Sequence, residues 1–463
     1  MLTPPQSLWW STLDSPVTPR PALSGHLDVD VAIVGGGFTG LWTARELKRR
    51  DPALRIAVLE KSVCGFGASG RNGGWASALY PLSDAGLINR YGMAAFMHQR
   101  RVLQQAVTTL GSRLAEDGIN ADFVQGGTLT FARNEVQVAR LKNAVRESVE
   151  HGGSTDDLVW LDPTALADRA VISGALGATF SPHCARIHPA RLVRGLADVV
   201  ASLGVQIFED STVTRIVPGT RGRQPQVVTV SGSVHADFVV QATEGFSSSF
   251  HGQRRDVAPV YSLMIATEPQ GDEFWSEVGF SGYETFADDR NLIIYAQRTS
   301  DGRIAFGGRG APYHFGSTVE ERFDANKKVF VELERTLREL FPTLRGAVSH
   351  TWGGPLGMTR DLSPFVRVDY DKGIASAGGY TGDGVVLSHV AATALADLLT
   401  QPDTETDFTQ LTFVQHPKKK WEFEPFRWLG VNAALGLAHW SDRVEEKHAT
   451  ESRASRLLNR LFD

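Results

Sequence analysis

The feature that most constrains this chain is a glycine-rich turn between a buried strand and a helix. Residues 28–34 (DVDVAIV) are typical of a buried strand, and they run into the turn Gly35-Gly-Gly-Phe-Thr-Gly40. Residues 41–50 follow a helical pattern, Pro52 interrupts it, and residues 55–60 (RIAVLE) indicate a second strand. A strand, a helix and a strand within about 30 residues predict a β-α-β unit.

The pattern Gly35-x-Gly37-x-x-Gly40 suits a turn that holds a pyrophosphate. Its small residues let the backbone approach the phosphates, and the amino end of the helix favours negative charge. Glu60 stands 23 residues after Gly37, where a carboxylate can accept the hydroxyls of a ribose. A carboxylate there disfavours a 2′-phosphate, so FAD and NAD remain as cofactors. An ordinary strand-helix turn is the structural alternative.

Two further glycine-rich stretches narrow the cofactor and the domain layout. Gly65-Phe-Gly-Ala-Ser-Gly-Arg-Asn-Gly-Gly74 has five glycines in ten residues, so its backbone N–H groups can lie along FAD; a mobile surface loop is the alternative. Ala377-Gly-Gly-Tyr-Thr-Gly-Asp-Gly384 opens an apolar helix predicted from about Val385 to Leu399. Because these segments stand at opposite ends of the chain, we expect a discontinuous cofactor domain made of residues 28–80, 186–245 and 350–400.

The remaining segments predict a second part with an antiparallel sheet. Residues 291–298 and 303–307 read as strands around the turn Thr299-Ser-Asp-Gly302, which indicates a hairpin. We expect the substrate domain to comprise residues 81–185 and 246–349, and residues 401–463 to form a helical tail. The predicted fold class is α/β, with a Rossmann-type cofactor domain and an α+β substrate part.

Composition and charge disfavour several classes of function. The 463 residues suit two or three domains, and 47 Lys and Arg against 52 Asp and Glu give a net charge of −5, which attracts neither nucleic acid nor an anionic membrane. The two cysteines, Cys64 and Cys184, make no CxxC motif, and no HxH or HExxH pattern predicts a metal site. Without a secretory signal or an apolar run of ~18 residues, we expect a cytoplasmic protein with no membrane span. The oligomeric state is left open.

Taken in order along the chain, these motifs resemble the D-amino-acid oxidase superfamily of FAD-dependent amine oxidoreductases. Within it, the nearest resemblance is to the γ-glutamylputrescine oxidase group. The segments that carry the resemblance are residues 34–41 (VGGGFTGL), Glu60, 65–74, 188–193 (HPARLV), Ala242-Thr243, 306–309 (FGGR), 352–354 (WGG) and 379–385 (GYTGDGV).

The resemblance implies a glutathione-reductase-like FAD-binding domain beneath an antiparallel sheet that roofs the flavin. Val213 would contact the adenine end through its backbone, and Gly382 to Val385 would meet the flavin ring. The helix that follows carries roughly +0.5 charge at its amino end, which would stabilise negative charge on the reduced flavin, unless these glycines only cap a packing helix. The implied FAD contacts are Gly35, Gly37, Phe38, Thr39, Gly40, Glu60, Lys61, Ala68, Ser69, Gly70, Arg71, Asn72, Gly73, Gly74, Val213, Ala242, Thr243, Gly379, Tyr380, Gly382, Asp383, Gly384 and Val385.

Two residues depart from the family pattern. Asp383 stands where a neutral or basic residue is often expected, and Glu244 stands where Asn often follows the Ala-Thr pair. Facing the flavin, Asp383 would oppose an anionic reduced ring and attract an ammonium group; facing solvent, it would suit the turn, and we favour the second interpretation. Neither Cys64 nor Cys184 falls in a segment that matches a covalent attachment, so we predict non-covalent FAD.

The implied chemistry places few demands on side chains. Amine oxidation by a flavin needs a neutral amine, a C–H bond aimed at flavin N5 and exclusion of water. Tyr283, Tyr295 and Trp352 are candidate walls of an amine pocket, with Tyr295 and Trp352 as the catalytic candidates, although core packing is the alternative for each. The candidates for binding a substrate carboxylate are Arg71, Arg309 and Arg360.

The sequence therefore predicts an FAD-dependent oxidase or dehydrogenase that takes a primary or secondary amine to an imine. The amine would be an amino acid or a polyamine conjugate, hydride would pass to flavin N5, and reoxidation by O2 would yield H2O2. Two alternatives stay open: a flavin-binding subunit of a multi-chain oxidase without independent activity, and an NAD(P)H-linked flavoprotein.

Overall fold

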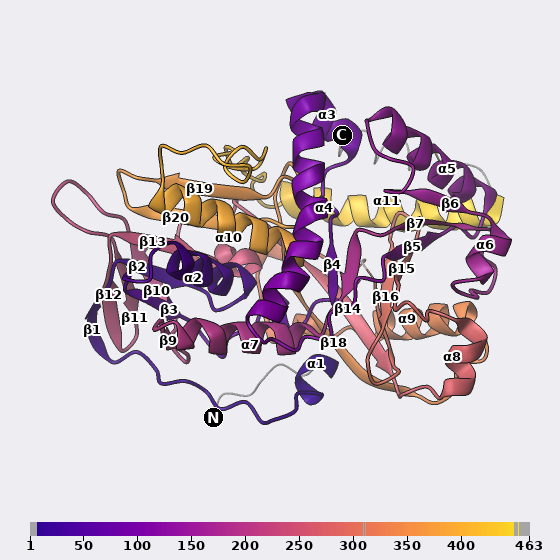
Figure 1. The fold of residues 1–463 in the computed structure, drawn as a ribbon, viewed down its shortest axis with the longest axis horizontal. Coiled ribbons are helices and arrows are strands. Elements are labelled where there is room, and N and C mark those ends of the chain that lie inside the picture. Colours follow the sequence, from indigo (N-terminus) through magenta and orange to yellow (C-terminus); the bar gives the residue numbers. More distant parts are fainter. Residues whose placement is uncertain (1–6, 309, 311, 449–451, 453–463) are drawn as a thin grey trace.

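The structure is a computed structural model that describes residues 7–308, 310, 312–448 and 452. Figure 1 shows two lobes, with the amino-terminal β-α-β unit in one and a large sheet in the other. Among the described residues, no helix is long and apolar enough to cross a membrane.

The first lobe is built on a six-stranded sheet that is parallel except at one edge. Its order is β19-β20-β13-β2-β3-β9, and only β19 runs antiparallel to its neighbour. All four residues of β2 and of β3 are buried, because helices cover one face of these strands and a four-stranded sheet covers the other. The strands are β2 (Val31–Val34), β3 (Ile56–Leu59), β9 (Gln206–Phe208), β13 (Phe238–Gln241), β19 (Phe365–Asp369) and β20 (Ile374–Gly378).

Four helices pack into one apolar core with this sheet. The helix α10 is buried along nearly its whole length, which suits its lack of a polar face. The helices are α2 (Phe38–Arg50), α4 (Met93–Glu116), α7 (Pro189–Ser202) and α10 (Gly384–Thr400). The four-stranded sheet lies beside them, in the order β1 (Gly25–Asp28), β12 (Gly232–His235), β11 (Gln226–Thr229) and β10 (Val213–Val217).

The predicted buried strand 28–34 is confirmed for residues 31–34 and wrong for its first residues, because the chain changes sheets within it. β1 ends at Asp28 and pairs with β12, whereas β2 starts at Val31 and pairs with β3 and β13. Between them, the Asp30 carboxylate accepts the backbone N–H of Arg55 at 2.7 Å, and Asp30 and Val31 donate their own N–H groups to the Arg55 carbonyl. These hydrogen bonds of Asp30 and Val31 therefore hold the point where the chain changes sheets against Arg55, at the start of β3.

The second lobe contains an eight-stranded sheet that is antiparallel except where β15 meets β5. The predicted hairpin is confirmed, with Arg298 of β16 paired to Ile304 of β17 across the turn. Helix α9 covers one face of the sheet with Leu333, Leu337 and Leu340. In sheet order the strands are β18 (Val348–Met358), β14 (Ala258–Thr267), β17 (Ile304–Gly308), β16 (Ile294–Arg298), β15 (Thr285–Asp288), β5 (Thr128–Phe131), β7 (Ala178–Ser181) and β6 (Val159–Leu161).

A two-stranded ladder, β4 (Trp75–Ser77) with β8 (Cys184–Arg186), lies against both lobes. The part of the predicted tail that the structure describes contains one long helix, α11 (Phe426–His448); residues 453–463 lie outside the described residues. The remaining helices are α1 (Leu8–Ser11), α3 (Asp84–Tyr91), α5 (Glu135–Glu150), α6 (Pro163–Ala167), α8 (Asp272–Val278) and α9 (Lys327–Leu340). Short 3₁₀ turns cover Ala68–Gly70, Glu244–Ser249, Phe315–Ser317 and Glu321–Asp324.

Candidate functional site

The turn after β2 needs its glycines for close backbone packing. Gly35 has φ of 110°, and a Cβ there would lie 2.4 Å from the Ala242 carbonyl oxygen. A Cβ on Gly40 would lie 2.0 Å from the Gly35 carbonyl oxygen. Gly37 is the N-cap residue of α2, which begins at Phe38, three residues before the predicted start. The first and third glycines thus let α2 pack directly against the strand ends.

The loop of residues 65–74 folds over the amino end of α2. The Ser69 hydroxyl accepts the backbone N–H of Phe38 at 2.8 Å, and a Cβ on Gly37 would lie 2.9 Å from the same oxygen. Asn72 closes the loop on itself by donating to the carbonyls of Ala68 and Ser69 and accepting the N–H of Gly74. The predicted pyrophosphate turn and the predicted flavin loop are therefore in contact.

Glu60 is held in place by two backbone N–H groups. Its Oε2 accepts from Gly36 at 2.8 Å, and its Oε1 accepts from Ser62 at 3.0 Å. Burial raises the pKa of its carboxyl, and the two N–H groups act in the opposite direction. Gly36 was not among the predicted contacts, yet a Cβ there would lie 2.7 Å from the Cys64 sulfur. The run of three glycines, Gly35 to Gly37, is the sequence feature that could have indicated this role.

Two segments that are far apart in the sequence meet beside this turn. Helices α2 and α10 run side by side (Figure 1), with Trp42 against His389 at 4.8 Å between ring centroids and Arg50 paired with Asp397 at 2.6 Å. At their amino ends, the Thr39 and Tyr380 hydroxyls are 3.0 Å apart. The loop of residues 379–384 therefore stands next to the start of α2, as a shared cofactor site requires.

Glu244 ties this second loop to β18. Its carboxylate accepts the backbone N–H groups of Gly379 at 2.7 Å and of Tyr380 and Gly357 at 3.3 Å each. Burial raises the pKa of Glu244 to about 7, although the three N–H donors lower it. Glu244, which departs from the family pattern, therefore has a structural role in holding the loop 379–384 against β18. We call the Gly35–Gly40 turn, Glu60, the loop 65–74 and the loop 379–384 the cofactor cradle.

The cradle lies beneath the eight-stranded sheet at Tyr295. A Cβ on Gly73 would lie 2.5 Å from the Tyr295 ring, and the Tyr295 hydroxyl is 2.6 Å from the Ser262 hydroxyl. Two residues further along β16, the Gln297 amide donates to the carbonyls of Gly73 and Gly74. Tyr295, one of the two predicted catalytic candidates, therefore packs against the flavin loop.

Trp352 and Arg71 are joined to each other. The Trp352 indole N–H donates to the Arg71 carbonyl at 2.9 Å, and its ring is buried in an apolar cluster with Leu8 and Trp9. The Arg71 guanidinium donates to the Asp324 carboxylate at 2.6 Å and to the Gly353 carbonyl at 3.1 Å. Both side chains therefore connect the loop 65–74 to its surroundings.

The other predicted substrate residues lie apart from these. Tyr283 contacts two guanidinium groups, those of Arg186 at 4.1 Å and Arg298 at 4.9 Å from its ring centroid. Arg360 is on the surface, where its Nε donates to Glu422 at 2.8 Å. Arg309 lies outside the described residues. The structure thus places neither Tyr283 nor Arg360 against the cradle.

Asp383 is half-buried at the N-cap of α10. Burial raises the pKa of the Cys184 thiol to about 12, and the negative charge of Asp383 adds to that increase. Cys184 is on β8 and contacts the Thr285 hydroxyl of β15 at 3.3 Å. Asp383 is therefore close enough to Cys184 for its charge to act on the thiol.

The remaining predicted contacts lie in several elements of the first lobe. Ala68 and Gly70 form the 3₁₀ turn of the loop, Lys61 is exposed just after Glu60, and Val213 opens β10. Ala242 donates to the Val34 carbonyl, and the Thr243 hydroxyl is 2.8 Å from that of Ser247. Gly382 has φ of 115°, and Val385 is buried in the first turn of α10.

The chemistry of this donor set fits FAD. A carboxylate has about four acceptor positions, and Glu60 uses one on each oxygen, so acceptors remain for two ribose hydroxyls. The amino end of α2 offers partial positive charge to a pyrophosphate, and α10 offers the same to the ring end of the cofactor. Glu60, the start of α2 and the two glycine-rich loops would hold the cofactor.

Comparison with known proteins decides the family. The family model described as DAO, FAD dependent oxidoreductase, matches residues 30–398. The chain belongs to the DAO family. Its FAD dependence follows from that membership and from the cradle.

Similar proteins extend over most of this DAO-family chain. It is 28% identical over 452 residues to the gamma-glutamylputrescine oxidoreductase of Escherichia coli, covering 96% of this chain and 99% of the relative. It is 28% identical to the probable oxidoreductase OrdL of Haemophilus influenzae, covering 83% and 85%. The crystal structure of glycine oxidase from Geobacillus kaustophilus has a TM-score of 0.69 at 21% identity, covering 84% of this chain and 100% of that one. The likeness to glycine oxidase confirms the predicted fold class.

Proposed function

We propose that this DAO-family protein oxidises a primary or secondary amine to an imine, which water then hydrolyses to a carbonyl compound and an amine or ammonia. The observation that carries the proposal is the contact between the cofactor cradle and the Tyr295 face of the eight-stranded sheet. The names of gamma-glutamylputrescine oxidoreductase and glycine oxidase support amines and amino acids as the substrate class.

The chain supplies electrostatics and shape for this reaction. When bound, FAD would supply the acceptor for the hydride that leaves the C–H bond next to the nitrogen, while the nitrogen loses a proton and the C=N bond forms. Helix α10 starts at Gly384 and directs its positive end toward the loop 379–384, which favours negative charge there. The half-buried Asp383 carboxylate would attract an ammonium group into the space between the lobes.

Tyr295 is the proposed wall of the amine pocket. Its ring packs against Gly73, and a Cβ on Gly307 would lie 2.5 Å from it, so the ring has little freedom to move. Such a ring can hold an amine by apolar contact and exclude water from the reacting bond. Arg71 already shares its guanidinium with Asp324, so we propose that it positions the flavin loop.

The first test is a spectroscopic titration of the purified full chain. We expect bound flavin that trichloroacetic acid releases completely into the supernatant, because its attachment is non-covalent. Under anaerobic conditions, at least one amine from a panel of polyamine conjugates, N-alkyl amino acids and D-amino acids should bleach the flavin band. Bleaching by alcohols or NADH, but by no amine, would contradict the proposal.

Turnover in air identifies the electron acceptor. We propose that O2 is consumed and H2O2 appears, whereas activity with an artificial dye alone would make the protein a dehydrogenase. A chain that binds FAD and turns over no amine by itself would instead favour the flavin-binding subunit of a multi-chain oxidase.

Tyr295→Phe tests the pocket wall. The variant keeps the ring and loses the hydroxyl contact with Ser262, so we expect kcat/KM to fall about tenfold while FAD content is unchanged. Tyr370→Phe is the matched control, since that hydroxyl donates to Leu398 at the molecular surface. Equal rates for both variants would show that the Tyr295 hydroxyl has no role in the reaction.

A further inference from the structure

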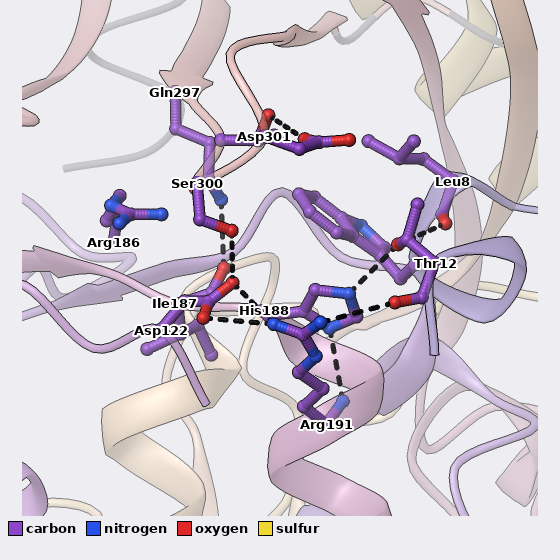
Figure 2. Close-up of a pocket in the computed structure, with 12 residues that line it drawn as sticks. Leu8, Thr12, Asp122, Arg186, Ile187, His188, Arg191, Gln297, Ser300 and Asp301 are labelled. Atoms are coloured by element: carbon purple, nitrogen blue, oxygen red, sulfur yellow. Dashed lines mark hydrogen bonds and ion pairs between the residues drawn. The ribbon is translucent and has the colours of Figure 1, made fainter. Parts of the chain in front are cut away.

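A cavity lies next to the flavin loop, at Gln297. It has a volume of about 190 Å³, enough for several water molecules or a small organic acid. Figure 2 shows its lining, which comes from α1, from the start of α7, from β8 and from the β16–β17 turn. Gln297 belongs both to this lining and to the contact with Gly73 and Gly74.

The two carboxylates of the lining already have cationic partners. Asp122 pairs with Arg191 at 3.0 Å and also accepts the Ser300 hydroxyl. Asp301 pairs with Arg303 at 2.7 Å and accepts the Thr299 hydroxyl at 2.6 Å. His188 adds no charge near neutral pH, because burial lowers its pKa to about 4.

Arg186 is the cation of the lining that forms no ion pair among the described residues; burial lowers the pKa of its guanidinium, and the charges of Asp122 and Asp301 act in the opposite direction. The residue is only 5% exposed, its Nε has no hydrogen-bond partner, and none of the ion pairs among the described residues includes it. Figure 2 shows its guanidinium directed toward Ser300 and Asp122, with no dashed line to either. A buried guanidinium without a hydrogen-bonded anion is costly, so this arrangement favours a ligand.

The ring of Tyr283 packs against this guanidinium. The Arg186 Cζ lies 4.1 Å from the ring centroid, and Arg298 occupies a position 4.9 Å from the same ring. Tyr283 also has φ of 56°, an unusual conformation for a bulky residue, which is consistent with a constrained functional position. The N–H groups at the edge of the guanidinium remain for a ligand.

We propose that this cavity binds a small carboxylate through Arg186, at a site separate from the cofactor cradle. A planar carboxylate can accept two parallel N–H bonds from one guanidinium. A phosphate dianion is disfavoured, because Asp122 and Asp301 line the same cavity and would repel a second negative charge. The proposal does not rest on amine oxidation.

Calorimetric titration of the FAD-loaded full chain with sodium acetate tests the site. We expect a dissociation constant in the millimolar range and no heat of binding from acetamide, which has a similar shape and no charge. Arg186→Gln should weaken acetate binding at least about tenfold, because the charge-assisted hydrogen bonds are lost. Arg186→Lys keeps the charge and should show an intermediate affinity.

Arg335→Gln is the matched control, because Arg335 is an exposed arginine of α9 that pairs with Glu332 and Glu339. It should bind acetate as the unmodified protein does. FAD content and melting temperature check that each variant is folded. Absence of binding at 100-fold excess over the expected constant, or unchanged binding in folded Arg186→Gln, would overturn the proposal.

The carboxylate has two chemical sources, and kinetics distinguish them. If it belongs to the substrate, Arg186→Gln should raise KM for amines that carry a carboxylate and leave KM for simple amines unchanged. If it is a separate acid, acetate should change the turnover of both kinds of amine in the unmodified protein and not in Arg186→Gln. Either result supports a carboxylate site, and the binding titration remains valid if no amine is a substrate.

Discussion

The cofactor cradle and the cavity at Arg186 are neighbouring sites made from different chemical groups. The cradle presents mainly backbone N–H groups, helix ends and glycines, with Glu60 held by the N–H groups of Gly36 and Ser62. The cavity presents charged side chains from four separate elements. A site built from backbone groups depends on the course of the main chain. A site built from charged side chains depends on which oppositely charged residue each of them pairs with. The following substitutions test that difference.

The largest effect is expected at Gly40. In Gly40→Ala the new Cβ would lie 2.0 Å from the Gly35 carbonyl oxygen, so α2 must move away from the strand ends. We expect FAD to be lost and stability to fall by about 3 kcal/mol or more. FAD content and urea unfolding measure this. Gly430→Ala, also in a helix but with nothing within 4 Å of the new Cβ, should keep FAD and be as stable or slightly more so.

Glu244 gives the next largest effect, visible as pH dependence. Its folded-state pKa of about 7 exceeds its ordinary value of 4.5, so between those pH values the folded state binds more protons than the unfolded state. Stability therefore falls as pH rises from about 4.5 to 7, by at most roughly 3 kcal/mol from this group.

Glu244→Gln removes the titrating proton while its amide oxygen can still accept from Gly379. We expect the fall in stability between pH 5 and 7 to be smaller in the variant, measured as thermal unfolding of the FAD-free chain. Equal pH slopes for the two proteins would show that Glu244 titrates normally.

Glu60→Gln is expected to weaken FAD binding by about tenfold. The amide keeps one acceptor oxygen, and its NH2 group faces one of the two backbone N–H groups that now donate to the carboxylate. Titration of the FAD-free chain with FAD gives the dissociation constant. Glu273→Gln is the control, since that side chain is 84% exposed on α8, and it should bind FAD normally. A normal constant for Glu60→Gln would contradict the ribose assignment.

Arg360 is expected to give the smallest effect. Its exposed ion pair with Glu422 is worth about 0–1 kcal/mol, so Arg360→Gln should change stability by no more than that. The sequence-based prediction of a substrate contact requires a higher KM for carboxylate-bearing amines. An unchanged KM for such amines would remove Arg360 from the substrate site.

Most of the cradle could be predicted from the sequence because its elements are local. A strand, a turn and a helix start leave a readable pattern within residues 28–74, and the loop 379–384 directly precedes its own helix. The error at residues 28–34 arose because one apolar run serves two sheets. Gly36 was missed because its role depends on Cys64 and Glu60.

The side-chain partners could not be predicted because they join distant segments. Arg71 meets Asp324 across 253 positions, Tyr295 packs on Gly73, and Arg360 finds Glu422 rather than its neighbour Asp361. In the sequence, Arg71 and Arg360 were equal candidates for binding a substrate carboxylate. Only folding shows that Arg71 and Arg360 have carboxylates, while Arg186, which the motifs did not indicate, has none among the described residues.

The contact between Thr39 and Tyr380 has a consequence for biosynthesis. A ribosome must translate the chain beyond α10 before the first and last parts of the cradle can come together. The amino-terminal β-α-β unit therefore emerges long before it can retain its prosthetic group, and flavin loading becomes a late, post-translational event. A nascent chain stalled before residue 379 should emerge colourless.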